Sequence, residues 1–479
     1  MSFPLVRALS AVDLPSNFSD LRTEALTSLL VKFQLVMNHN ECKQKAVIAL
    51  NVIPEARVVP LNMKIAVWHN LPSGGGKRAL YYHVRGLVAK GHSVEAWCPT
   101  TSDRTYLPLS ELITEHVLPI EIDQRDNFGT RGFLGEAYGH QLRAAKALDQ
   151  HCQSCADQIN RRTFDVLFAN SSIIQAVSSI GRYVKTKKVL YLQEPNRGLY
   201  EATEGGLPWV AIPAQSRPWL HRSYMRWFVF DLIRTQKLRV LARDERLNAS
   251  SFDLILVNSY FSRESLLRIY GLDSTVCYLG VDTALFMNRH HSRDNLVVSV
   301  GELSAHKNVE FIINAVAQMR GPRPRLVWIA NRGPEWYCEK MRSLAESSGV
   351  SFEIRWRVDD NELIETLNRA AAMVYTPRLE PFGFAPLEAN ACGLPVIAVA
   401  EGGVRETIID GVNGLLVQHQ PQAMAHAIER LRDDKHLAAQ LGKNGTALVG
   451  EKWSVNSAVE RLETQLTQAT MPKASRNFE

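Results

Sequence analysis

Two carboxylates in one segment, Pro377–Val396, have the types and spacing that could hold the hydroxyl groups of a bound ligand. Glu380 lies in a polar loop that follows a short apolar strand ending near Tyr375, and Glu388 lies eight residues later, about two residues beyond Pro386. Carboxylates in such places could hold the hydroxyl groups of a sugar and a ribose. The plainer alternatives are a solvated loop charge for Glu380 and a capping-box acid in a first helical turn for Glu388.

The elements around this segment would place both carboxylates beside a helix N-terminus. Pro386 suits the first turn of a helix, where its missing N–H costs nothing, and Gly393 suits its end. Ligands of parallel α/β sheets bind outside the carboxyl ends of the strands, where such helices begin. Free N–H groups of Phe382, Gly383 and Phe384 could therefore bind an anion such as a diphosphate.

The rest of the chain alternates between strands and helices in two series. The first begins with the apolar strand 64–68, a glycine loop at Ser73–Gly76 and an amphipathic helix that Gly91 would end. The second begins at Leu296–Gly301. Each series predicts a parallel sheet with helices on both faces. Further strands are expected at 94–98, 166–169, 189–192, 254–258, 326–330, 373–375 and 395–399.

These series divide the chain into an N-terminal and a C-terminal Rossmann-like domain, each with a doubly wound parallel sheet. The predicted boundaries are an N-terminal extension at 1–62, either an appendage or packed on the core, and an N-terminal domain at 63–288. A polar linker at 287–295 leads to a C-terminal domain at 289–453, followed by a helix at 454–468 and a tail at 471–479. A length of 479 residues exceeds what one hydrophobic core usually serves.

Composition narrows the class of protein. The chain is 46% hydrophobic and 22% charged, and its net charge of +6 does not require a nucleic-acid partner. Its seven dispersed cysteines, Cys152 and Cys155 among them as one CxxC, fit ordinary thiols in a reducing compartment. No signal peptide, membrane span or metal-ligand cluster stands out. We therefore expect a cytoplasmic protein without a resident metal or cofactor.

The Glu380–Glu388 segment resembles the Glu–seven residues–Glu motif of the family-4 retaining glycosyltransferases (glycosyl transferases group 1), which have the GT-B fold. Other matches follow in the family's order over roughly 63–465. They are Leu256-Val-Asn-Ser259 with Phe261-Ser262, Gly280-Val-Asp282, Val300-Gly301 with Lys307-Asn308, Gly402-Gly403 with Glu406, and Asp410-Gly-Val-Asn-Gly414 with Leu415.

The resemblance implies a retaining transfer from a nucleotide-diphospho-sugar to a glycan, lipid-linked or small-molecule acceptor, in polysaccharide or glycoconjugate synthesis and without a metal. Glu380 would act at the reacting carbon and Glu388 on the ribose hydroxyls. Lys307 would neutralise the leaving diphosphate, with backbone amides of Phe382, Gly383 and Phe384. The loop containing Gly75 and Gly76 would close over the diphosphate from the other domain. The resemblance also implies that 63–288 is the acceptor domain, that 289–453 is the donor domain, and that helix 454–468 crosses back to the acceptor domain.

The chain departs from the family pattern at two places. Glu302 stands where the family has a phosphate-binding arginine, so Arg332 or Arg378 is expected to supply that charge, unless Lys307 and backbone amides suffice. Glu194 lies near the place of a family histidine, either assisting the acceptor or without a catalytic part. His69 would pack or line the site.

Segment 217–247 is helical in character, aromatic and basic. It could dock peripherally on an anionic membrane, at its inner face, or its aromatic residues could fill the domain core beneath a solvated row of arginines. Two rival functions also remain open on the sequence: a non-catalytic nucleotide-sugar binder or assembly partner, which Glu302 favours, and a nucleotide-sugar epimerase on the same fold.

Overall fold

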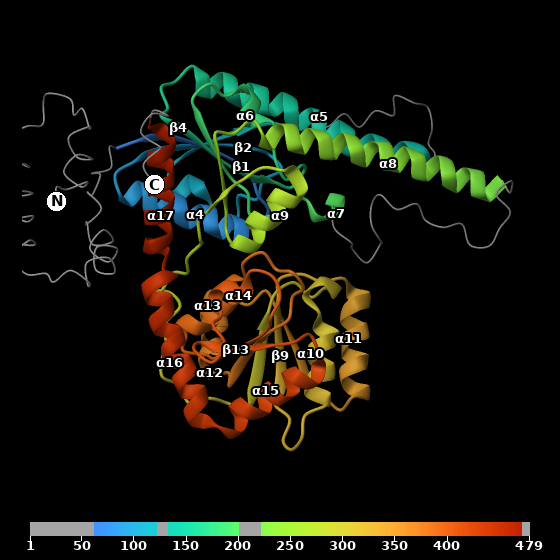
Figure 1. The fold of residues 1–479 in the computed structure, drawn as a ribbon, viewed down its shortest axis with the longest axis vertical. Helices are drawn as coiled ribbons and strands as arrows, with labels where there is room; N and C mark the ends of the chain where they lie inside the picture. Colours follow the sequence, from blue (N-terminus) through green and yellow to red (C-terminus); the bar gives the residue numbers. More distant parts are fainter. Residues whose placement is uncertain (1–61, 122–132, 201–221, 472–479) are drawn as a thin grey trace, which may run out of the picture. The chain divides into compact units, whose positions relative to one another are not determined.

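The computed structural model describes residues 62–121, 133–200 and 222–471. The expected extension at 1–62 and the tail at 471–479 therefore lie almost entirely outside the described residues. Figure 1 shows two groups of strands and helices, one formed by residues before 280 together with the last helix, Val455–Thr470, and the other by the remaining residues after 290. Among the described helices, none is both long and apolar enough to cross a membrane.

The first sheet has seven parallel strands in the order β3-β2-β1-β4-β5-β6-β7. Its central strand β1 is buried on both faces, as expected for a strand covered by helices on each side. The strands are β1 Lys64–Asn70, β2 Ser93–Pro99, β3 Thr114–Leu118, β4 Val166–Ser172, β5 Lys187–Tyr191, β6 Leu254–Val257 and β7 Thr275–Val276. The helices are α4 Gly75–Ala89, α5 Phe133–Asn160, α6 Ile180–Tyr183, α7 Arg197–Tyr200, α8 Arg222–Ala249 and α9 Tyr260–Tyr270, with a 3-10 turn at Leu109–Glu111.

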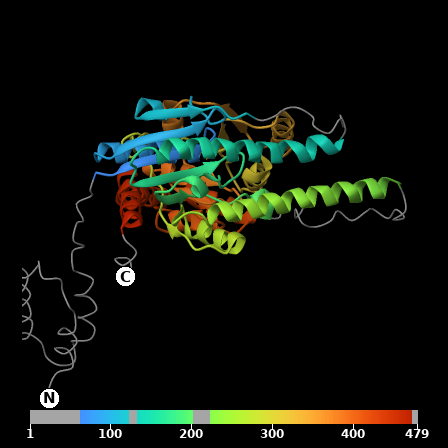
Figure 2. The ribbon, with the colours of Figure 1, turned by 90° about the horizontal axis from the view of Figure 1, so that it is seen from above.

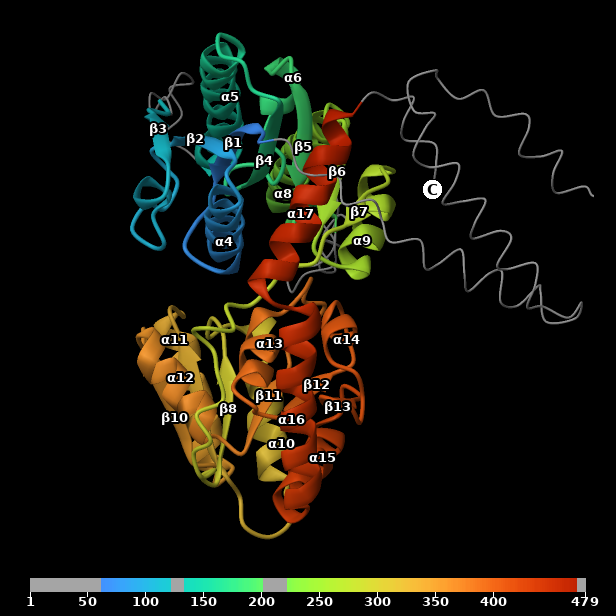
Figure 3. The ribbon, with the colours of Figure 1, turned by 90° about the vertical axis from the view of Figure 1, so that its left-hand side faces the viewer.

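The second sheet has six parallel strands in the order β10-β9-β8-β11-β12-β13. Figure 3 shows helices on both of its faces. The strands are β8 Leu296–Val300, β9 Arg325–Ala330, β10 Phe352–Trp356, β11 Ala372–Tyr375, β12 Val396–Val399 and β13 Gly414–Val417. The helices are α10 Val309–Ala317, α11 Glu335–Ser347, α12 Asp360–Arg369, α13 Phe384–Ala391, α14 Val404–Thr407, α15 Pro421–Asp433, α16 Lys435–Lys452 and α17 Val455–Thr470, with a 3-10 turn at Ala305–Lys307.

This architecture confirms the predicted pair of doubly wound parallel sheets. In each sheet the strand order reverses once, between β1 and β4 and between β8 and β11. The loops that leave the carboxyl ends of strands on either side of a reversal diverge and leave room for a ligand. The glycine loop follows β1, Lys307 follows β8 and Glu380 follows β11, so all three predicted site segments lie at reversal points.

Two chain segments, one at Val281 and one at Trp453–Val455, run side by side where the two sheets are joined. The backbone of Val281 accepts a hydrogen bond from Val455 and donates one to the carbonyl of Trp453. Beyond this point α17 packs on α4, β4 and β5 of the first sheet. The carboxylate of Glu463, on α17, accepts hydrogen bonds or ion pairs from His92 (2.9 Å) and Lys90 (2.8 Å).

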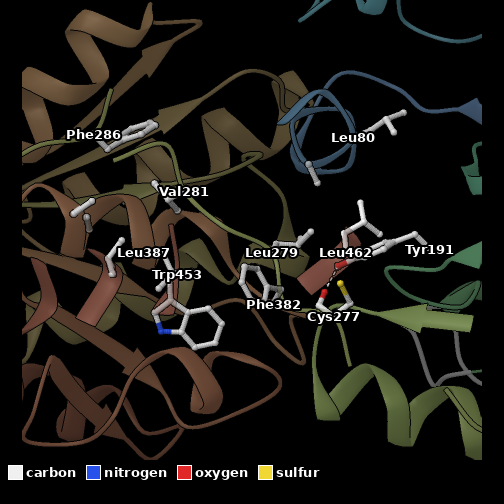
Figure 4. Packing of buried hydrophobic residues seen from close by; sticks show 14 of the residues in the cluster. Leu80, Tyr191, Cys277, Leu279, Val281, Phe286, Phe382, Leu387, Trp453 and Leu462 are labelled. Atoms are coloured by element: carbon white, nitrogen blue, oxygen red, sulfur yellow. Dashed lines mark hydrogen bonds between the residues drawn. The ribbon is translucent and has the colours of Figure 1, made fainter. Parts of the chain in front are cut away.

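A continuous apolar cluster runs through this junction. Figure 4 shows its members from both sheets, and the indole of Trp453 lies close to the ring of Phe382, with centroids 5.8 Å apart. Tyr191 at the end of β5 donates a hydrogen bond to the carbonyl of Cys277 (2.5 Å). The predicted donor segment is therefore attached to the same core that holds the two sheets together.

The junction leaves no room for a side chain at position 280. A Cβ on Gly280 would lie 2.2 Å from the carbonyl oxygen of Ser454. Gly280→Ala is expected to destabilise the protein by about 1–3 kcal/mol through this overpacking. Gly450→Ala is the matched control, because no atom lies within 4 Å of that Cβ and alanine favours the helix. Urea unfolding of both variants checks this; equal midpoints would contradict it.

Candidate active site

The loop that carries Glu380 has an unusual backbone on either side of the carboxylate. It leaves β11 at Tyr375 and reaches α13 after Gly383. Leu379 (φ 50°) and Gly383 (φ 86°) both have positive φ values. A positive φ is costly for a leucine, so surrounding contacts must hold this turn.

Two glycines after β12 supply these contacts. The N–H of Gly403 donates to the carbonyl of Glu380 (2.8 Å). A Cβ at Gly402 would lie 2.4 Å from the Glu380 carbonyl oxygen, and one at Gly403 would lie 2.0 Å from that of Pro381. The Gly402-Gly403 pair is therefore required for the close approach of two backbones, and it fixes the direction of the Glu380 loop.

The N-terminus of α13 carries the predicted anion site. Among the described residues, none accepts a hydrogen bond from the backbone N–H groups of Phe382, Gly383 or Phe384. Both aromatic side chains turn away into packing, with their ring centroids 5.5 Å apart and Phe382 only 3% exposed. The backbone, not the side chains, is thus what these residues present to an anion.

Lys307 and Glu380 meet in the structure. The Lys307 Nζ lies 2.6 Å from Glu380 Oε2, and both side chains are 20% exposed. Lys307 ends a 3-10 turn, and Asn308 (φ 61°) then starts α10 in a left-handed conformation. The lysine expected at a leaving diphosphate and the carboxylate expected at the reacting carbon are therefore neighbours.

Glu388 is the fifth residue of α13, so the capping-box alternative is wrong: α13 has no acidic residue in its first turn. The helix begins at Phe384, earlier than the position of Pro386 suggests, because Gly383 provides its N-cap. The carboxylate is 4% exposed and forms an ion pair with Arg78 of α4. Burial raises the pKa of Glu388, and the charge of Arg78 offsets part of this effect.

The glycine loop touches the N-terminus of α13. A Cβ on Gly75 would lie 3.3 Å from the ring of Phe384, and one on Gly76 would lie 3.1 Å from the side-chain amide of Gln193. These contacts explain why side chains are absent at both positions. They bring the start of α4 next to the predicted diphosphate site.

The two arginines considered as substitutes at Glu302 already have carboxylate partners. Arg332 pairs with Glu302 itself (3.1 Å), and the Arg332 side chain is 71% exposed. Arg378 pairs with Glu401 (2.5 Å). Such exposed pairs are weak and exchangeable, so the predicted role of Arg332 in donor binding stays a prediction.

Comparison with known proteins identifies the family to which this site belongs. The family model described as glycosyl transferases group 1 matches residues 282–448, which include Lys307, Glu380 and Glu388. The match covers the C-terminal part of the chain. The family segment coincides with the second sheet and its helices, so the predicted donor residues all lie within it.

Individual relatives agree with the family. The chain is 28% identical over 251 residues to human alpha-1,3/1,6-mannosyltransferase ALG2, a match that covers 47% of this chain and 60% of that protein. It is 33% identical over 244 residues to the D-inositol 3-phosphate glycosyltransferase of Frankia alni, covering 46% and 58%. The matches span less than two thirds of either relative.

Solved glycosyltransferase-like structures share the two-domain GT-B fold of this chain. HepE of Anabaena, in complex with UDP and glucose, matches at 18% identity and a TM-score of 0.60, over 85% of this chain and 99% of HepE. Sucrose-phosphate synthase of Thermosynechococcus elongatus matches at 19% identity and a TM-score of 0.61, over 85% and 98%. At these identities the likeness concerns the fold.

The family motifs outside the donor loop form a second set of contacts between the two sheets. The Glu406 carboxylate accepts hydrogen bonds from the N–H groups of Tyr260 (2.9 Å) and Phe261 (3.0 Å) and from the hydroxyl of Tyr278 (2.9 Å). The Ser259 hydroxyl, which also caps α9, donates to the carbonyl of Pro381 (2.6 Å). These motifs position the Glu380 loop.

Sequence reasoning missed Arg78 and Tyr106. Arg78 lies two residues after Gly76 and reaches Glu388, 310 residues away, while its Nε donates to the hydroxyl of Tyr106 (2.8 Å). The only signal was an arginine in the first turn of α4, where a cation opposes the helix dipole. That placement costs stability unless a carboxylate is near.

A buried polar cluster was also missed, formed by residues near the carboxyl ends of β1 and β2 and near the start of β3. Glu115 accepts a hydrogen bond from His69 Nε2 (3.2 Å) and one from the Cys98 thiol (3.6 Å), and these ligand atoms lie within 4.8 Å of one another. They could hold a metal, but fully buried Lys77 lies near enough to lower the pKa of His69, after burial itself. The positive charge of Lys77 balances the buried charge of Glu115, so the carboxylate does not require a metal ion beside it.

The burial of His69, Glu194 and the two CxxC cysteines bears on the roles expected for them. His69 is fully buried, as packing requires, and Glu194 is exposed. Cys152 and Cys155 are free and buried, and burial raises the pKa of both thiols, which disfavours their thiolate forms.

Helix α8 accounts for most of segment 217–247 and packs along α5 (Figure 2). Residues 217–221 and the side chains of Arg222, Arg226 and Arg234 lie outside what the structure describes. Phe228, Val229 and Leu232 are 53%, 42% and 50% exposed. The exposed ring of Phe228 therefore does not fill the domain core.

Removing the charge of Glu406 is expected to loosen the contact between the sheets. Glu406→Gln replaces a carboxylate that accepts three hydrogen bonds with an amide oxygen that accepts fewer, at a cost of about 1.5–3 kcal/mol. The control is Glu264→Gln, whose partner Arg268 is exposed on the surface of α9. Urea unfolding measures both, and similar losses in the two variants would argue against this role of Glu406.

Proposed function

We propose that this chain is an enzyme that transfers a sugar from a nucleotide-diphospho-sugar to an acceptor hydroxyl, with retention of anomeric configuration and without a metal. The observation that carries the proposal is the Lys307–Glu380 pair, whose carboxylate lies just before the N-terminus of α13 in the chain and whose lysine is a cation suited to a phosphate. The acceptor would be a glycan, a lipid-linked sugar or a small molecule.

Electrostatics give each group a part in this reaction. Breaking the bond between the anomeric carbon and the diphosphate places negative charge on the leaving oxygen and positive character on the sugar ring. The Lys307 ammonium and the α13 amides would stabilise the first, and the Glu380 carboxylate the second. The leaving phosphate oxygen would take the acceptor's proton on the same face of the sugar, so no separate protein base is needed. Glu388 would hold the ribose hydroxyls.

Several observations support a nucleotide-sugar donor. The structurally similar HepE is described in complexes with UDP and with UDP-glucose. The sequence relatives are named as a mannosyltransferase and a D-inositol 3-phosphate glycosyltransferase. The second observation favours transfer over epimerisation, because both sequence relatives are named for transfer of a sugar.

We expect nucleotide diphosphate to be released from one member of a panel of UDP-, GDP- and ADP-sugars. Glu380→Gln should lower the rate of release about 100-fold or more, because it removes a charge next to the developing cation. Glu388→Gln should mainly raise KM, since its proposed contact is with ribose in both ground and transition states.

The control for this assay is Glu264→Gln, on the exposed surface of α9. Saturable donor binding without release, even with cell-derived acceptors present, would favour the non-catalytic binder. Interconversion of the donor sugar with no loss of diphosphate would favour the epimerase.

We also propose that α8 docks on an anionic membrane that carries the acceptor. The exposed apolar residues Phe228, Val229 and Leu232 lie on a helix whose sequence is rich in arginine. Apolar side chains that enter the lipid interface, together with cations near anionic headgroups, are the two terms of such binding.

Partitioning to sedimented vesicles tests this docking. The double variant Phe228→Ser/Leu232→Ser should reduce binding to phosphatidylserine-containing vesicles about 10-fold, because it removes two apolar side chains that would be buried in the lipid interface. Leu267→Ser on α9, equally exposed at 53%, is the matched control. Unchanged partitioning of the α8 variant, and of a charge reversal at Arg222, Arg226 and Arg234, would reject membrane contact through this helix.

A further inference from the structure

Arg78 joins the first sheet's glycine loop to the helix that carries Glu388. It lies near the start of α4, three residues after Gly75, whose backbone packs on Phe384 at the start of α13. Its guanidinium pairs with the Glu388 carboxylate through Nη1 and with the Tyr106 hydroxyl through Nε. One cation thus lies between the expected ribose site and the expected diphosphate site.

Tyr106 holds this guanidinium in place. Its own position is set by a turn in which the Asp103 carboxylate accepts hydrogen bonds from the N–H groups of Thr105 (2.8 Å) and Tyr106 (2.9 Å). The N–H of Asp103 in turn donates to the carbonyl of Leu71, just before the glycine loop. The arginine is therefore anchored to the first sheet through Nε, while Nη1 reaches Glu388.

The pair with Glu388 must change when a donor binds. Glu388 is the carboxylate proposed for the ribose hydroxyls. In this structure, however, one Glu388 carboxylate oxygen pairs with Arg78, and the Glu388 side chain is only 5% exposed. The Arg78 side chain is 18% exposed, so a ligand can reach it. A guanidinium displaced from a carboxylate needs another anion close by, because an unpaired charge in a partly buried place is costly.

The cations near the α13 N-terminus have carboxylate partners too. Lys307 pairs with Glu380, Arg332 with Glu302 and Arg378 with Glu401. The last two pairs are on exposed side chains. Arg78 differs from them because Tyr106 holds it in a largely buried position. The guanidinium of Arg78 is therefore held more firmly than those of Arg332 and Arg378.

We infer that Arg78 is a donor-binding residue that exchanges Glu388 for the diphosphate of the nucleotide sugar, an inference that rests on the proposed function. The exchange frees the Glu388 carboxylate for the ribose hydroxyls as the guanidinium moves to the phosphate oxygens. Arg78 thereby supplies, from the first sheet, the cation that Glu302 does not provide on the second. Binding of the donor and contact between the two sheets are coupled through this one side chain.

Arginine suits this exchange better than lysine does. A planar guanidinium can keep its Nε bond to Tyr106 while its two terminal nitrogens turn between a carboxylate and a phosphate, both of which it binds in a forked geometry. An ammonium group has no equivalent of the Nε anchor. Lysine at this position should therefore restore charge but only part of the affinity.

Nucleotide binding by the full chain tests the inference. Titration calorimetry at pH 8 compares UDP, GDP and ADP with their nucleosides for the wild type, Arg78→Met, Arg78→Lys and Tyr106→Phe. We expect Arg78→Met to weaken binding of the preferred diphosphate by about 10–100-fold, as loss of a charged hydrogen bond predicts, with the nucleoside unchanged or tighter. Arg78→Lys and Tyr106→Phe should give intermediate losses.

Arg85→Met is the matched control. Arg85 also lies on α4 and also pairs across the two sheets, with Asp282 (2.7 Å), but its partner belongs to the junction and not to the donor loop. It should leave diphosphate affinity unchanged. Circular dichroism and thermal unfolding of every variant show whether the fold is retained, and Arg78→Lys keeps the test valid if Arg78→Met does not fold.

The pH dependence of nucleoside binding tests whether Arg78 keeps the Glu388 carboxylate ionised for its contact with ribose. Burial raises the pKa of Glu388 and Arg78 lowers it, so Arg78→Met raises it further. Loss of nucleoside binding on acidification should therefore begin at a higher pH in Arg78→Met than in the wild type or in Arg85→Met. A purely structural pair would weaken nucleoside and diphosphate by equal factors.

The outcomes distinguish the two proposals. Diphosphate binding that Arg78→Met leaves unchanged, or that it weakens by the same factor as the nucleoside, overturns the inference and leaves the proposed function standing. A wild-type protein that binds none of the three diphosphates overturns the proposed function and this inference with it.

Discussion

The geometry of the site depends on one constraint: a carboxylate buried on α13 must have a cation beside it. Glu388 is 4% exposed, and its partner Arg78 comes from the other sheet. A buried charge without a partner would cost several kcal/mol. The start of α4 is therefore held against the start of α13, where Gly75 has no side chain that would crowd the ring of Phe384.

Close packing of backbone on backbone also holds the loop that carries Glu380. The backbone of Glu380 and Pro381 lies against Gly402 and Gly403, and the hydroxyl of Ser259 reaches the Pro381 carbonyl from the first sheet. These contacts hold a loop whose Leu379 has a positive φ. Strain of this kind persists where the surroundings over-determine the conformation, which is typical of loops that place functional groups.

Charge on the site is arranged as exchangeable pairs. Lys307–Glu380 and Arg78–Glu388 each join a cation suited to phosphate with a carboxylate suited to hydroxyl groups. Such a site is nearly neutral without ligand, which limits repulsion among its own charges. A ligand that carries both phosphate and hydroxyl groups can satisfy all four at once, whereas inorganic phosphate satisfies only the cations. That asymmetry favours an intact sugar nucleotide over simple anions.

The sequence alone determined the class of fold and the donor loop, because both depend on local signals. Buried parallel strands read as apolar runs, and the glycines and prolines around Glu380 mark a strand-to-helix turn. The strands that local pattern did not predict, β3, β7, β10 and β13, are the four sheet edges, where one side faces no neighbouring strand and apolar runs are short. Only the tertiary structure decided which charges meet. Arg78 and Glu388 are 310 residues apart, and the start of α13 one turn before Glu388 was set by Gly383. The partner of a buried charge follows from the packing of the two sheets, and no local pattern records that packing.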